Sequence, residues 1–160
     1  MCIRDSFRIE EELKEKMNIP VFHDDQHGTA IISGAGLVNA VELVNKKMSD
    51  IKININGAGA SAISCARLFV TLGANPNNIL MCDSKGVIYK GREGLNKQKE
   101  EFAVETDCRS LDDTFDGADV FIGLSVGNVV SKDMILKMNE NPIVFAMANP
   151  DPEISPKDAF

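Results

Sequence analysis

The most informative stretch of this chain for its fold is Ile51-Lys52-Ile53-Asn54-Ile55-Asn56-Gly57-Ala58-Gly59-Ala60-Ser61-Ala62. Its first half alternates apolar and polar side chains, which is typical of a β-strand. Gly57 permits a tight strand-to-helix turn, Gly59 lets backbone N–H groups approach a pyrophosphate, and Ala62 fills the last position of a G-x-G-x-x-G/A pattern. The stretch predicts a dinucleotide-binding turn, with a merely structural tight turn as the alternative.

Strand and helix patterns alternate along the chain on both sides of this turn. Downstream, helical patterns cover residues 60–72, 97–104, 111–115 and 132–138, and strand patterns cover 79–82, 119–124 and 143–147. Upstream lie a short amphipathic helix from Phe7 to Met17, a brief strand at Val21-Phe22 and a longer helix over residues 29–47. This order predicts an α/β fold, a doubly wound parallel sheet of the Rossmann-like type.

The length and composition exclude several classes of protein. A chain of 160 residues fits one domain, and its net charge of −7 argues against a nucleic-acid partner. No apolar run approaches the ~18–20 residues of a membrane span. The four cysteines match no zinc pattern, so we expect them to be reduced and structural: Cys2, Cys65, Cys82 and Cys108. A cytoplasmic enzyme domain is the expected class.

An acid ends the strand that follows the glycine turn. Asp83 stands where a carboxylate accepts hydrogen bonds from the adenosine ribose hydroxyls, which favours NAD. Lys85, two residues later, is suited instead to the 2′-phosphate of NADP. The sequence therefore leaves the choice between NAD and NADP open.

A second polar cluster, His23-Asp24-Asp25-Gln26-His27, precedes the long helical pattern. Its paired carboxylates suit Mg²⁺ or Mn²⁺. The two histidines have the spacing of a helical zinc motif, but Pro20 and Gly28 favour a strand-to-loop segment here. Another interpretation is that the acids cap a helix beginning at Thr29, which explains one acid but not a pair.

Two motifs follow the last strands. Gly123-Leu124-Ser125-Val126-Gly127 has the letters of a hydrolase nucleophile elbow, but both histidines lie upstream, contrary to the hydrolase order. We therefore expect Ser125 to make room for the nicotinamide half of a cofactor. Asn149 follows the final strand, at the edge where open α/β sheets bind ligands, although a rigid proline turn is the alternative.

These motifs together resemble the NAD(P)-binding domain of malic enzyme, in its bacterial branch. The matching segments occur in the same order, from about Phe7 to the end of the chain: residues 19–30, 57–62, 83–86 and 148–153. The resemblance implies oxidative decarboxylation of malate to pyruvate and CO₂ with NAD or NADP and with Mg²⁺ or Mn²⁺. It also implies that the parent protein is a homo-oligomer.

The resemblance assigns roles to individual residues. Asp25 is the implied metal ligand, and Asp24 is implied to orient a catalytic lysine. Asn149 is implied to contact the nicotinamide side or the substrate. The pyrophosphate is implied to lie along a run that begins at Gly57 and continues through Ala58, Gly59, Ala60 and Ser61.

The chain also departs from the family pattern. Residues 1–6 do not match the Glu-Asp pair that supplies the other metal ligands, and we expect them to be a foreign start. Residues 7–28 then form the end of the catalytic and metal region, and residues 29–160 form the NAD(P)-binding domain, truncated at its C-terminus. The catalytic lysine and tyrosine of the family lie in a domain that precedes this segment. We therefore expect a fragment that is inactive alone; a stand-alone nucleotide-binding module and another dehydrogenase are the rivals.

Overall fold

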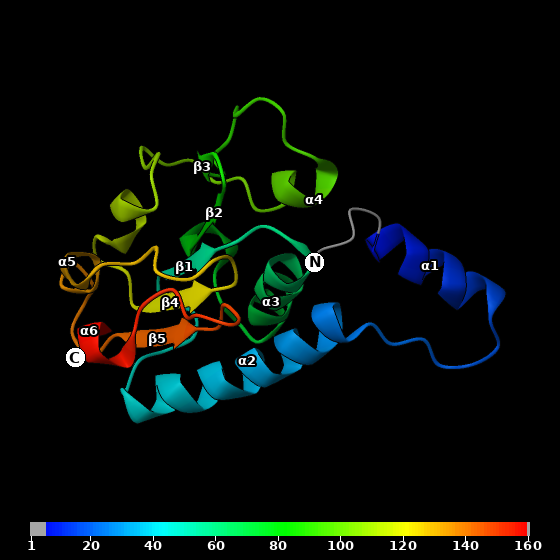
Figure 1. The fold of residues 1–160 in the computed structure, drawn as a ribbon, viewed down its shortest axis with the longest axis horizontal. Coiled ribbons are helices and arrows are strands. Elements are labelled where there is room, and N and C mark those ends of the chain that lie inside the picture. The colour runs from blue at the N-terminus through cyan, green and yellow to red at the C-terminus, as the bar shows by residue number, and fades with distance from the viewer. Residues whose placement is uncertain (1–5, 160) are drawn as a thin grey trace.

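The computed structural model describes residues 6–159, and residues 1–5 of the expected foreign start lie outside this range. Figure 1 shows a sheet flanked by helices, with α1 set apart from it. The strands are β1 (Ile53–Asn56), β2 (Ile79–Asp83), β3 (Gly86–Val87), β4 (Val120–Gly123) and β5 (Ile143–Ala146). The helices are α1 (Ser6–Lys16), α2 (Asp24–Leu43), α3 (Ala60–Thr71), α4 (Lys97–Glu100), α5 (Lys132–Ile135) and α6 (Pro156–Ala159), with 3-10 turns η1 (Pro76–Asn78) and η2 (Asp112–Phe115).

The sheet has the order β3-β2-β1-β4-β5. β1 pairs in parallel with β2 and with β4, and β4 pairs in parallel with β5. The doubly wound prediction is confirmed for these four strands. β3 is the exception, because the turn after Asp83 returns the chain along β2 as an antiparallel edge.

Both faces of the sheet are covered. α2 and α3 pack together over one face, around the fully buried Leu37 and Phe69. Gly34 explains how closely these helices approach, since an added Cβ would lie 2.8 Å from a methyl carbon of Leu68. On the other face the rings of Phe115 and Phe121 stack with centroids 5.1 Å apart. All four residues of β1 are therefore buried, including its polar ones.

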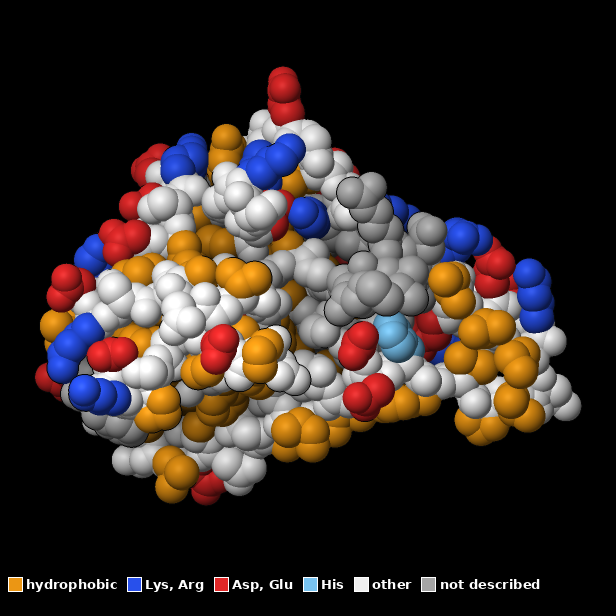
Figure 2. All heavy atoms as spheres, viewed as in Figure 1, with side chains coloured by type: hydrophobic (Ala, Val, Ile, Leu, Met, Phe, Trp, Pro, Cys, Tyr) orange, Lys and Arg blue, Asp and Glu red, His pale blue; other side chains and the backbone are white. Residues whose placement is uncertain are grey.

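The segment before α2 differs from the prediction. The strand expected at Val21-Phe22 is absent, because no neighbouring strand lies there to pair with it. α2 begins at Asp24 rather than at Thr29, so Asp24 and Asp25 occupy its first turn, where the helix dipole favours negative charge. The boundary expected after residue 28 thus falls inside α2. Figure 2 shows apolar side chains gathered over α1 and the segment that follows it.

Helix ends follow local chemistry. Gly73 has a φ of +105° at the end of α3, and its N–H donates to the Val70 carbonyl oxygen, as in a glycine cap. α4 is capped by the Asn96 side chain but ends at Glu100, short of the expected residue 104. No helix among residues 6–159 combines the length and the apolar character needed to cross a membrane.

Candidate dinucleotide site

Two adjoining hollows lie over the carboxyl ends of the parallel strands. The first, of about 760 Å³, is bordered by the start of α2, the start of α3 and the loops after β4 and β5. The second, of about 720 Å³, extends over the end of β2. Because both are lined by Gly59, Leu124 and Ser125, they form one continuous groove at the edge where such sheets bind ligands.

The glycine turn forms the floor of this groove. Gly57 has a φ of +133°, and an added Cβ would lie 2.7 Å from the Leu124 carbonyl oxygen, so both conformation and space require glycine. Gly59 is the N-cap of α3 and offers no capping side chain. The amides of the first turn of α3 are consequently left for an anionic ligand, which is the arrangement that binds pyrophosphate.

The acidic cluster meets the glycine turn in space. Asp24 and Asp25 are exposed and line the first hollow together with Ser61. The Ser61 hydroxyl donates a hydrogen bond of 2.6 Å to the Asp25 carbonyl oxygen, across 36 positions of sequence. This bond fixes the start of α2 against the start of α3, so the acids stand beside the expected phosphate site.

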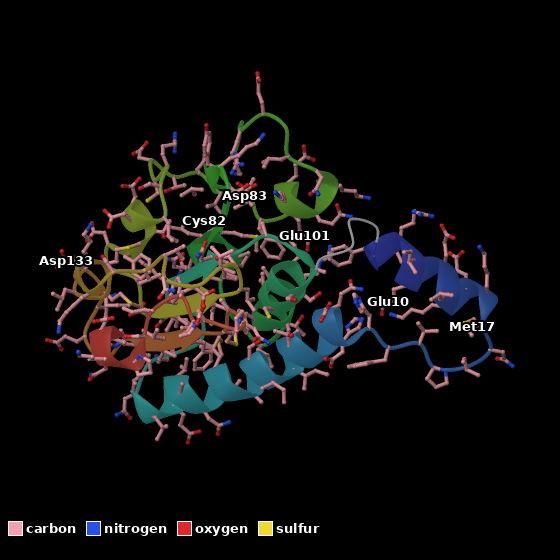
Figure 3. The ribbon with its side chains drawn as sticks, in the orientation of Figure 1. Glu10, Met17, Cys82, Asp83, Glu101 and Asp133 are labelled. Carbon is pink, nitrogen blue, oxygen red and sulfur yellow. The ribbon has the colours of Figure 1, made fainter. Side chains whose placement is uncertain are left out.

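The two histidines do not form a metal site. The Nδ1 atom of His23 lies 2.7 Å from the Gln26 side-chain nitrogen, and His27 lies 2.6 Å from the buried carboxylate of Glu10. Glu10, labelled in Figure 3, thereby joins α1 to α2. The expected strand-to-loop conformation here is wrong, since His27 lies on α2. Each imidazole is instead held by a neighbouring side chain, His23 by Gln26 and His27 by Glu10.

The fit of a divalent metal to these residues is incomplete. Within residues 6–159 no three His, Cys, Asp or Glu side chains are grouped so that they could hold a metal ion. Asp25 is a single exposed carboxylate, and its nearest ionic contact is His23, at 3.8 Å. Mg²⁺ requires six oxygen ligands and gives up its hydration reluctantly, so this carboxylate alone does not make a metal site.

Asp83 is engaged by cations rather than left open. Its carboxylate accepts hydrogen bonds from Arg92 at 2.6 Å, from Lys99 at 2.5 Å and from the Lys85 backbone N–H at 2.9 Å. Burial alone would raise the pKa of Asp83, but the bonds from Lys99 and Arg92 outweigh it and lower the pKa. Figure 3 shows Asp83 at the end of β2, near α4.

The second hollow therefore carries an excess of positive charge. Lys85, Lys99 and Arg109 line it, against the single carboxylate of Asp83. Sequence reasoning noted Lys85 but missed Lys99, which lies on α4, and Arg109, which lies in the loop before η2, because they follow it by 14 and 24 residues in the sequence. The only sequence signal was a run of basic residues downstream of the acid.

The far end of the groove is built by Ser125 and Asn149. Both line the first hollow, and their expected place on the nicotinamide side of a cofactor stays a prediction. The Ser125 hydroxyl accepts a hydrogen bond of 2.7 Å from Asn56, at the end of β1. Glu153, which sequence reasoning did not consider, accepts hydrogen bonds from the backbone N–H groups of Ser125 and Ala148.

This site has the features of the dinucleotide-binding domain of a dehydrogenase. They are a glycine turn at a helix start, an acid ending the next strand and a groove over the carboxyl ends of parallel strands. Comparison with known proteins identifies which dehydrogenase family this is. A family model described as "Malic enzyme, NAD binding domain" matches residues 26–160. The chain belongs to the malic enzyme family.

Individual relatives agree with this assignment. The chain is 57% identical to an NADP-dependent malic enzyme of Rhizobium meliloti over 155 residues, which are 96% of this chain and 20% of that protein. It is 50% identical over 154 residues to an NAD-dependent malic enzyme of the same organism, again 96% of this chain and 20% of that protein. The crystal structure of Entamoeba histolytica malic enzyme superposes with a TM-score of 0.93 at 42% identity, covering 99% of this chain and 35% of the other. The chain thus spans a fifth to about a third of the length of these relatives.

Proposed function

We propose that this chain is the nucleotide-binding part of an enzyme that oxidatively decarboxylates malate to pyruvate and CO₂. The observation that carries the proposal is the hydrogen bond from Ser61 to the Asp25 carbonyl oxygen, which joins the phosphate-binding turn to the acidic cluster. Chemistry on malate needs the nicotinamide and the groups that polarise the substrate within one cleft. In support, the acids Asp24 and Asp25 line the same hollow as Ser125 and Asn149. Membership of the malic enzyme family argues against the rival dehydrogenases.

The cofactor takes a defined direction along the groove in this proposal. The first-turn amides of α3 bind the pyrophosphate, with Gly57, Ala58, Gly59, Ala60 and Ser61 as the surrounding residues. The adenosine half lies in the second hollow, beside Asp83. The nicotinamide half lies in the first hollow, where Ser125 and Asn149 hold it and where the ring meets the substrate. Nicotinamide supplies the hydride acceptor.

We propose NADP as the preferred nucleotide. The carboxylate of Asp83 is already bonded to Arg92 and Lys99, so it is poorly placed to accept from a free ribose hydroxyl. The surplus positive charge from Lys85, Lys99 and Arg109 suits a 2′-phosphate instead. Some relatives are named NADP-dependent and others NAD-dependent, so family membership does not distinguish the two nucleotides. The proposal of NADP rests instead on the positive charge of the second hollow.

The acids act together with parts of the parent enzyme. Asp25 contributes one oxygen ligand to Mg²⁺ or Mn²⁺, whose other ligands are not among the described residues, and Asp24 orients a lysine from a preceding domain. The parent is a homo-oligomeric cytoplasmic enzyme in this proposal. Because this part of the site holds one metal ligand and no such lysine, we expect no malate turnover by this chain.

Calorimetric titration of the chain with NADP⁺ and NAD⁺, each with and without Mn²⁺, tests the proposal. We expect NADP⁺ to bind at least about tenfold more tightly than NAD⁺, since a hydrogen bond between charged groups contributes about 1.5–3 kcal/mol. Mn²⁺ should change neither affinity. Failure to bind either nucleotide would refute the dinucleotide site. Malate turnover by the chain alone would refute the proposal that catalysis needs groups outside the described residues.

A further inference from the structure

Glu153 is a fully buried carboxylate directly behind the nicotinamide end of the groove, with 0% of its surface exposed. One oxygen lies 3.1 Å from the Ser125 backbone nitrogen, in the loop after β4. The other lies 3.0 Å from the Ala148 backbone nitrogen, in the loop after β5. A single side chain therefore holds the two loops that border the first hollow.

The surrounding backbone is arranged to admit this carboxylate. An added Cβ at Gly123, the last residue of β4, would overlap the carboxylate of Glu153, so the strand ends in the one residue that leaves room for it. The main chain around Glu153 is anchored as well. Its carbonyl accepts from the Val130 N–H at 3.0 Å, and the Pro152 carbonyl accepts from the Asn128 N–H at 2.9 Å.

The contacts continue to a third strand. Ser125 receives a hydrogen bond from Asn56 at the end of β1, so one chain of bonds runs from Asn56 through Ser125 and Glu153 to Ala148. It ties together the carboxyl ends of β1, β4 and β5. Ser125 and Ala148 both line the first hollow next to Asn149, so this chain sets the spacing of the walls there.

We propose that Glu153 is a positioning residue that holds the loops after β4 and β5 at the separation the nicotinamide ring requires. This role rests on the proposed function, since it assumes that the nicotinamide occupies the first hollow. A carboxylate is suited to it because both its oxygens are acceptors, whereas an amide would set its NH₂ group against one of the two backbone N–H groups. Asn149, which follows Ala148, is then placed indirectly by Glu153.

Glu153→Gln tests this role because it preserves shape and removes one acceptor. The probes are NADP⁺, which has both halves, and 2′,5′-ADP, which has only the phosphorylated adenosine half. We expect the variant to bind NADP⁺ about tenfold more weakly than the wild type, which corresponds to the loss of one hydrogen bond to a charged group. Its affinity for 2′,5′-ADP should stay within about twofold of the wild type. Glu140→Gln, the same change at an exposed position, is the matched control and should alter neither.

The outcomes separate the two proposals. Equal weakening of both ligands would show a general structural role and overturn the positioning role, as would unchanged binding of NADP⁺. A wild-type chain that binds neither ligand would overturn the proposed function and the role of Glu153 with it. Should the variant fail to fold, amide hydrogen exchange on the wild type decides: we expect the Ser125 and Ala148 amides to be protected without nucleotide, and rapid exchange would overturn the role.

Discussion

Replacing Asp83 by asparagine separates the two nucleotide interpretations most directly. The carboxylate is 10% exposed and accepts three hydrogen bonds, two of them from the charged groups of Arg92 and Lys99. Asparagine keeps one acceptor oxygen and turns its NH₂ group toward a cation. The loss of one such bond corresponds to a free energy of unfolding lower by about 2 kcal/mol, within the range of about 1.5–3 for bonds to charged groups.

The same substitution should improve discrimination for NADP⁺. Removing a negative charge about 4 Å from a 2′-phosphate would relieve a repulsion of about 1 kcal/mol even at the dielectric constant of water, which is about fivefold in affinity. We therefore expect Asp83→Asn to be less stable in urea unfolding and yet to bind NADP⁺ about fivefold more tightly by calorimetry, with NAD⁺ affinity unchanged.

The control is Asp112→Asn, which removes a carboxylate from an exposed ion pair with Lys137. Exposed pairs contribute about 0–1 kcal/mol, so this variant should change neither stability nor nucleotide preference measurably. If Asp83→Asn instead lowered NAD⁺ affinity and left NADP⁺ affinity unchanged, Asp83 would be a ribose acceptor, and the assignment of the second hollow to a 2′-phosphate would be refuted.

Three further predictions concern stability and reactivity. Gly57→Ala should lower the free energy of unfolding by about 2–3 kcal/mol and abolish nucleotide binding, because Gly57 has a positive φ and a Cβ there would collide with the Leu124 carbonyl oxygen. Urea unfolding close to that of the wild type would contradict this. Burial raises the pKa of Asp119, but its hydrogen bonds, above all the one from Lys46, lower the pKa overall. The stability that Asp119 contributes should therefore be complete above the unfolded pKa of about 3.9 and be lost as the pH falls below that value, which an acid titration followed by circular dichroism measures. Burial raises the pKa of the Cys82 thiol to about 12, so peptide mapping after alkylation at pH 8 should find it unmodified in the folded chain and modified in denaturant.

Much of the fold was predictable because its signals are local. The run from Ile51 to Ala62 contains its own strand pattern, turn glycines and helix start, and the structure reproduces each of them. Gly73 likewise signals the end of α3 without reference to any other part of the chain. Two of the failures, at Val21-Phe22 and at β3, concern strands, which exist only where a partner strand lies beside them. The others concern the ends of helices, such as the start of α2 at Asp24 and the end of α4 at Glu100.

The candidate site divides in the same way between what is local and what is not. Sequence alone predicts the Rossmann-like class, the tight glycine turn and the acids Asp24, Asp25 and Asp83, since each depends on residues adjacent in the chain. The three-dimensional structure was needed to show that Asp83 is bonded to Lys99 and that Glu153 joins the loops after β4 and β5. The bonds from Lys99 to Asp83 and from Ser125 to Glu153 span 16 and 28 positions of sequence, and the packing of strands and helices sets which distant polar groups meet.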